Sequence, residues 1–199
     1  MTATPATALL RRGLRLEFAT LGWNVAGTVV LVLLALRAGS PALAGFGFDS
    51  LIEIGASLVV VWELSGAPEL RERRAMRLIG IAFCLLAAFI VVQVAVLLVA
   101  GRRPAPSPLG IVWTATTFVV MLLLATGKLR TGAQLGNPVL RTEGRVTLVD
   151  AGLAAAVLVG LALNAVLGWW WADPVAGLVI VYSAVREART ALAYGAEGT

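Results

Sequence analysis

The chain has 199 residues, of which 59% are hydrophobic and only 14% are charged. Soluble domains average about 25% charged and about 45–50% apolar residues, so this composition indicates an integral membrane protein. The net charge of +5 does not indicate nucleic-acid binding, because no basic patch carries interleaved aromatic residues. The chain lacks histidine, which excludes histidine-ligated metal sites and Ser-His-Asp catalysis. A single cysteine, Cys84, excludes an internal disulfide.

The apolar residues form segments long enough to cross a hydrocarbon core about 30 Å thick. They lie near residues 14–36, 41–65, 77–100, 109–127, 141–167 and 169–187, with Gly, Ser and Pro at the breaks. The sequence therefore predicts an all-α, six-helix transmembrane bundle over residues 14–190. A cytoplasmic N-terminal segment (1–13), with no cleavable signal peptide, and a short polar tail (191–199) are expected to flank it.

The distribution of Lys and Arg predicts the orientation of this bundle. If both termini are cytoplasmic, thirteen of the sixteen basic residues lie on the cytoplasmic side: Arg11, Arg12, Arg15, Arg71, Arg73, Arg74, Arg77, Lys128, Arg130, Arg141, Arg145, Arg186 and Arg189. Only Arg37, Arg102 and Arg103 remain outside. Because cytoplasmic loops carry excess positive charge, we expect both termini inside, in the plasma membrane of a prokaryote.

Two acids lie in the middle of the second apolar segment, within FDSLIEIGAS (residues 48–57). Asp49 and Glu53 are one helical turn apart and project from the same face. One charged side chain at the centre of a membrane helix costs about 2.5–3.5 kcal/mol or more, and two on one face also repel each other. The pair therefore indicates a position at which a cation or a proton is bound.

Other polar residues fall at related depths. Counting 1.5 Å of rise per residue places Asn24 and Asp150 near the level of Glu53. Glu17 and Glu143 lie seven residues further toward the cytoplasm on the same two helices, where they are expected to line an access path.

Stripes of small residues predict which spans pack together. Gly45, Asp49, Glu53 and Ser57 form one i, i+4 stripe, and a second includes Gly160 in the fifth span. Because small residues let membrane helices approach closely, we expect the second and fifth spans to pack together. Asp173, before a proline, is expected to cap the sixth helix.

Three carboxylates without nitrogen or sulfur ligands form a hard, oxygen-rich donor set. Such a set suits Mn²⁺, Mg²⁺ or Fe²⁺, and holds Zn²⁺ less selectively. Metal binding would release protons, because the ligands must be deprotonated. Alternatives stay open: Asp49 and Glu53 as protonated acids bonded across helices, Asp150 as a partner of Arg145, Asn24 as a helix–helix contact, and interfacial positions for the two outlying acids.

At this point the sequence resembles a known family. FDSLIEIGAS closely resembles the second-helix signature of the cation diffusion facilitator (cation efflux) family, in which two acids four residues apart bind metal. RTEGRVTLVD (residues 141–150) is similar to its Arg-Ala-Asp-x-x-His-x-x-x-Asp pattern, and GWWWADP (residues 168–174) to its usual start of the sixth helix. The similarity covers about residues 14–190.

The resemblance implies that Asp49, Glu53 and Asp150 occupy three of four transport-site positions, with Asn24 as a further candidate ligand. The fourth position, usually His or Asp, is Val146. The family's cytosolic metal-binding domain is not expected, because the sequence ends at Thr199. A homodimer would therefore form through membrane helices alone.

The expected function is transport of a divalent metal ion out of the cytoplasm, coupled to protons by alternating access. Metal, protons and membrane lipid are the expected partners, with no resident cofactor and no enzymatic activity. One alternative is a non-transporting interaction or regulatory protein that kept the fold, which Val146 favours. Another is a transporter of organic cations that uses the acids as counter-ions.

Overall fold

The computed structural model describes residues 5–64 and 69–196. Within these ranges the chain forms helices and no strands: α1 (Pro5–Ala38), α2 (Pro41–Leu64), α3 (Glu69–Val99), α4 (Pro108–Leu135), α5 (Pro138–Leu167) and α6 (Ala172–Ala196). The predicted all-α bundle is confirmed. The predicted break at 65–68 and the outermost parts of both predicted terminal segments lie outside the described residues.

Proline, glycine and short polar residues set the helix ends. Pro108 begins α4, where the N–H that proline lacks would have no helical partner. Ser107 and Asn137 cap α4 and α5 by accepting backbone N–H bonds. Gly136 and Gly168 follow the same two helices with φ of 64° and 68°, a left-handed conformation that glycine adopts without strain.

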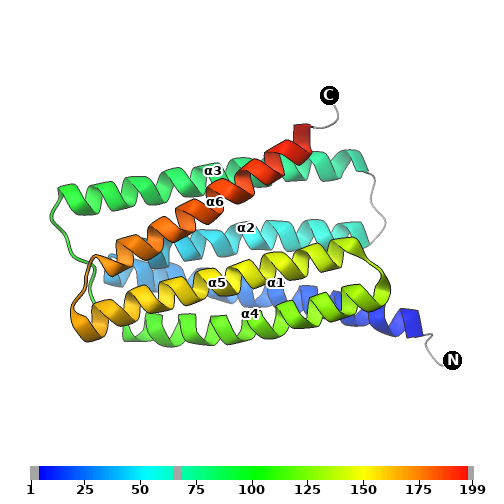
Figure 1. Ribbon diagram of the computed structural model, residues 1–199, viewed down its shortest axis with the longest axis horizontal. Coiled ribbons are helices and arrows are strands. Elements are labelled where there is room, and N and C mark those ends of the chain that lie inside the picture. Colours follow the sequence, from blue (N-terminus) through cyan, green and yellow to red (C-terminus); the bar gives the residue numbers. More distant parts are fainter. Residues whose placement is uncertain (1–4, 65–68, 197–199) are drawn as a thin grey trace.

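The helices run along a common axis, and both ends of the described chain lie at one end of the bundle, the termini end (Figure 1). α2 packs against α1, α3, α5 and α6, so it is the central helix. α4 packs against α5 and α1. Polar side chains that α2 turns toward α1 and α5 are therefore screened from lipid by other helices.

The apolar core joins α2 to its neighbours. It includes Leu31, Leu43, Ile90, Val157 and Ile180, which come from five different helices and are almost completely buried. Close packing of these side chains against one another holds the helices around α2. The core lies mainly in the half of the bundle that is farther from the termini end.

The predicted contact between the second and fifth spans is confirmed, because α2 packs against α5. Two glycines of the predicted stripes do not make this contact themselves. A Cβ on Gly45 would lie 2.6 Å from Ile90 of α3, and one on Gly160 would lie 2.8 Å from Ala176 of α6. These glycines allow close approach to α3 and α6, which sequence spacing alone does not reveal.

Asp173 lies in the first turn of α6 but stabilises a different helix end. Its carboxylate accepts hydrogen bonds from Ser40 Oγ at 2.5 Å and from the Ala42 N–H at 3.3 Å. It therefore caps the start of α2 rather than α6, and the predicted role is corrected. This buried contact ties the two helices together at the end opposite the termini end.

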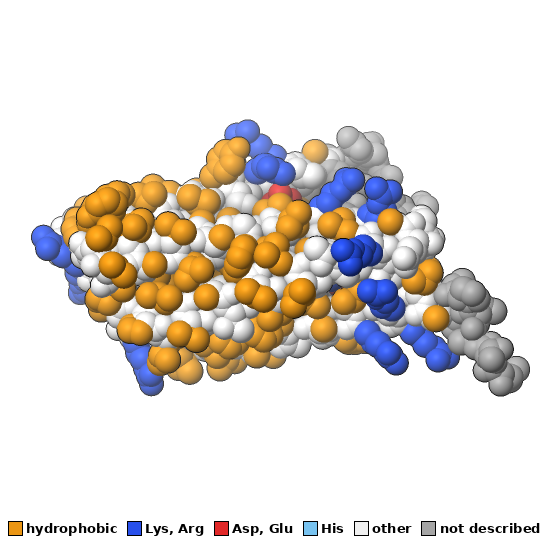
Figure 2. All heavy atoms as spheres, turned by 60° about the horizontal axis from the view of Figure 1, so that its bottom comes forward, with side chains coloured by type: hydrophobic (Ala, Val, Ile, Leu, Met, Phe, Trp, Pro, Cys, Tyr) orange, Lys and Arg blue, Asp and Glu red, His pale blue; other side chains and the backbone are white. Residues whose placement is uncertain are grey.

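The exterior of the bundle fits a membrane. In the described residues, three helices are long and apolar enough to span one, namely Ala8–Ala38, Pro108–Leu135 and Glu143–Leu167, and Phe83–Val99 is a shorter apolar helix. Figure 2 shows one face, on which hydrophobic side chains cover most of the length of the bundle and Lys and Arg gather mainly at the termini end. This distribution supports an integral membrane protein.

Candidate cation site

The central helix carries the two acids that the sequence singled out. Asp49 and Glu53 are each 6% exposed, and both point into the bundle from successive turns of α2. Ser57, one turn further toward the termini end, is completely buried. The polar stripe of α2 is therefore its inward face.

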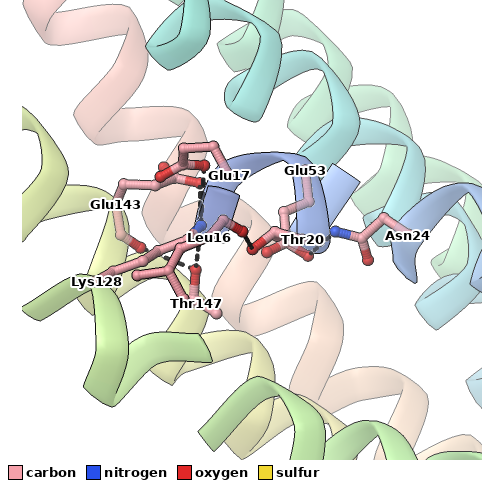
Figure 3. Close-up of polar contacts among 8 residues, drawn as sticks. All are labelled: Leu16, Glu17, Thr20, Asn24, Glu53, Lys128, Glu143 and Thr147. Carbon is pink, nitrogen blue, oxygen red and sulfur yellow. Dashed lines mark hydrogen bonds and ion pairs between the residues drawn. The ribbon is translucent and has the colours of Figure 1, made fainter. Parts of the chain in front are cut away.

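Residues from α1 and α5 meet Glu53. Asn24 Nδ2 donates a 2.7 Å hydrogen bond to Glu53 Oε2, and both side chains are buried (Figure 3). Asp150 of α5 is also buried and close enough to Glu53 for their carboxyl groups to interact directly. Asp49 lies within electrostatic reach of both acids. The structure thus brings together Asn24, Asp49, Glu53 and Asp150, called here the acid cluster.

Two oxygens of the acid cluster have no hydrogen-bond partner within the described part of the chain. They are Glu53 Oε1 and Asp150 Oδ2, and both are buried. Buried polar atoms are nearly always hydrogen-bonded, so each unpaired oxygen needs an explanation. Two explanations fit: a proton shared between the two carboxyl groups, or a bound cation, because carboxylate oxygens are the ligands that hard divalent ions prefer.

The acid cluster is not a closed coordination shell. Among the described residues, no three His, Cys, Asp or Glu side chains converge tightly enough to form a ready-made metal site. Glu53 and Asp150 lie close together, whereas Asp49 is one turn away on α2.

The surroundings of Asp150 settle two details. Arg145 is exposed, and no ion pair joins it to the buried Asp150 among the described residues, so the alternative of an Arg145 partner is not supported. Val146, at the position that usually carries the fourth ligand, is half-buried on the same helix. The ligands that the acid cluster offers to a cation are therefore carboxylate and amide oxygens.

A second buried cluster lies nearer the termini end (Figure 3). Lys128 of α4 is completely buried, and its ammonium nitrogen lies 3.1 Å from Glu17 Oε2 and 3.3 Å from Glu143 Oε1. It also donates a 3.1 Å hydrogen bond to Thr147 Oγ1. Thr147 in turn donates to the Glu143 carbonyl oxygen at 3.0 Å. Glu17, Lys128, Glu143 and Thr147 are called here the lysine cluster.

The placement of Lys128 corrects the sequence analysis, which counted it among loop charges. The predicted fourth span stops at residue 127, whereas α4 continues to Leu135. A signal was present: Thr117, Met121 and Leu124 precede Lys128 at spacings of three or four residues, and all are buried. This period places Lys128 on the inward face of α4.

Glu17 and Glu143 are brought together from α1 and α5, as their matching depths suggested. They do not line an open passage in this structure. Glu17 is completely buried and Glu143 is 4% exposed, with the Lys128 ammonium between them. Their predicted role in cation access stays a proposal.

Comparison with known proteins adds the family. Residues 76–194 match the family model described as the cation efflux transmembrane domain. This range holds most of α3, all of α4 and α5 and most of α6, and with them Lys128 and Asp150. α1 and α2, which carry Asn24, Asp49 and Glu53, precede it. The comparison with curated proteins found no match. Because the family model covers more than half of the chain, the protein belongs to the cation efflux family.

Proposed function

We propose that this cation transporter moves a divalent metal ion from the cytoplasm across the membrane in exchange for protons, by alternating access. The family match supports cation transport in general. The observation that carries the finer proposal is the pair of buried, unpaired carboxylate oxygens, Glu53 Oε1 and Asp150 Oδ2. They belong to helices that meet at the centre of the bundle.

The donor chemistry supports the choice of ion. Carboxylate and amide oxygens suit Mn²⁺, Mg²⁺ or Fe²⁺, and the absence of histidine from the sequence disfavours selective Zn²⁺ binding. Asp49, Glu53 and Asp150 would bind the ion, while Asn24 orients Glu53 through its hydrogen bond.

Proton coupling follows from the same ligands. Carboxylic acids must lose their protons to bind a metal ion, so loading the acid cluster with metal releases protons and protonation releases metal. The excess of Lys and Arg on one side supports cytoplasmic termini. The termini end would then face the cytoplasm, and the lysine cluster would lie between the cytoplasm and the acid cluster.

Transport into proteoliposomes tests the proposal. Under a pH gradient, wild-type protein is expected to accumulate Mn²⁺, and an Asp49→Ala, Asp150→Ala double variant is expected to lose accumulation. Asp173→Asn is the matched control, because Asp173 is a buried carboxylate of α6 that bonds to Ser40 and the Ala42 N–H and lies outside both clusters. Equal accumulation by the double variant and the wild type would contradict the proposed site.

One observation favours an organic cation as a second candidate substrate. The lysine cluster already holds an alkylammonium group between two carboxylates. An organic-cation transporter would therefore show competition between Mn²⁺ and a small alkylamine for uptake. Inhibition of Mn²⁺ uptake by Mg²⁺ or Fe²⁺, but not by methylamine, supports the metal.

A further inference from the structure

The lysine cluster contains an internal cation at the centre of an oxygen-rich cage. Lys128 is completely buried and contacts Glu17, Glu143 and Thr147, which supply two carboxylates and a hydroxyl group. These are hard oxygen donors, the same chemistry as in the acid cluster. The ammonium group thus occupies a position whose ligands also suit a divalent ion.

The Lys128 ammonium does not pair with every buried oxygen around it. Glu17 Oε1 is buried and has no hydrogen-bond partner in the described residues. Thr131 Oγ1 on α4, three residues after Lys128, and Ser57 Oγ on α2 are also buried and unpaired. A structural ion pair that only stabilised the fold would be expected to satisfy its buried partners more fully.

The position of the lysine cluster relates it to the acid cluster. Glu17 precedes Asn24, and Glu143 precedes Asp150, by seven residues each, which corresponds to about 10 Å along both helices. Lys128 is also within electrostatic reach of Glu53. The two clusters are therefore successive polar levels between the termini end and the centre of the bundle, called here the polar path, which is closed in this structure.

We propose that Glu17, Glu143 and Thr147 form a second divalent-cation position on this path, and that the Lys128 ammonium keeps the position closed in the state described here. The inference deepens the proposed function, on which its role in transport rests. An entering ion would have to displace the Lys128 ammonium from the two carboxylates, so the position is expected to fill only when that charge moves away or is removed. The flexible four-carbon stem of lysine allows the ammonium group to move away.

The test is the number of Mn²⁺ ions that purified protein binds, measured by equilibrium dialysis in detergent. Wild type is expected to bind about one, in the acid cluster. Lys128→Gln removes the ammonium charge while keeping a hydrogen-bond donor, and is expected to bind about two. Adding Glu143→Gln to Lys128→Gln should abolish the additional ion, because it removes one of the two carboxylates that would hold it.

The controls separate this inference from the proposed function. Lys128→Arg keeps a cation between the carboxylates and should bind as wild type does. If wild type binds no Mn²⁺ but Lys128→Gln binds one that depends on Glu143, the proposed acid-cluster site fails and the second position stands. If Lys128→Gln does not fold without metal, the same variant prepared with Mn²⁺ is expected to fold, because the ion replaces the lost positive charge between Glu17 and Glu143. Failure of Mn²⁺ to restore folding, while Lys128→Arg folds, would contradict the inference.

Two further results would overturn the inference. The first is a Lys128→Gln protein that is folded by size-exclusion chromatography and binds the same number of ions as wild type. The second is an additional ion that persists after Glu143→Gln, which would place it elsewhere in the molecule.

Discussion

The acid cluster and the lysine cluster differ in one respect that separates their roles. Both are buried; the acid cluster takes its carboxylates from α2 and α5, and the lysine cluster takes its two carboxylates from α1 and α5. In the lysine cluster, α4 supplies an ammonium group that pairs with Glu17 and Glu143. In the acid cluster no Lys or Arg forms an ion pair with its carboxylates among the described residues, and oxygens of Glu53 and Asp150 are unpaired.

A buried charge is stable when it is paired, and removing one partner leaves an uncompensated charge. The lysine cluster therefore contains its own cation, whereas the acid cluster depends on a cation or protons that enter from outside. Substitutions in the two clusters should then have opposite effects on stability, which the following predictions test.

The largest effect is expected for removal of the internal cation. Lys128→Met leaves Glu17 and Glu143 buried without their partner, which should lower stability by about 3–5 kcal/mol. Thermal unfolding in detergent measures this loss. Adding Glu17→Gln should recover part of it, because one buried charge is then removed; no recovery would argue against charge imbalance as the cause.

The matched change in the acid cluster should have the opposite sign. Without metal, Glu53→Gln is expected to raise the melting temperature, because it removes repulsion between Glu53 and Asp150. With Mn²⁺ the wild type should gain stability, by about 2.7 kcal/mol at a hundredfold excess over Kd, and Glu53→Gln should not. Destabilisation of metal-free protein by Glu53→Gln would contradict this contrast.

Part of the fold and of the acid cluster could be predicted from the sequence. The proline and glycine breaks located the helices, and counting helical rise brought Asn24 to Glu53, which the 2.7 Å hydrogen bond bears out as a contact. Such inferences use only positions along each helix. The use of Asn24 and Glu53 as metal ligands stays a prediction.

The missed features depend on contacts between distant parts of the chain. The burial of Lys128 follows only when α1, α4 and α5 come together, and the predicted fourth span ended at residue 127, just before it. Asp173 bonds to Ser40, 133 residues away, rather than to its own helix. Helix spacing gives the inward face of each helix but not the neighbour that meets it.

A smaller effect is expected from the residue that orients Glu53. Asn24→Ala removes the hydrogen bond to Glu53 Oε2 but leaves all three acids in place. Loss of such a supporting contact typically weakens metal binding about 10- to 100-fold. Calorimetric titration with Mn²⁺ measures the change, and unaltered affinity would show that Asn24 only joins α1 to α2.

The smallest effect is expected outside both clusters. Asp173→Asn weakens the cap on α2 and should lower stability by about 1 kcal/mol. Because Asp173 contacts neither cluster, Mn²⁺ affinity should not change. A loss of affinity as large as that of Asn24→Ala would show that the start of α2 positions the acids.

The most direct test of the acid cluster as the cation site is Mn²⁺ titration of purified wild-type and Asp150→Asn protein in a weakly buffered solution. The wild type is expected to bind Mn²⁺ and release protons, and Asp150→Asn, with one oxygen ligand replaced, is expected to lose both signals. Equal binding by the two proteins, or binding by the wild type without proton release, would contradict the proposed proton-coupled carboxylate site.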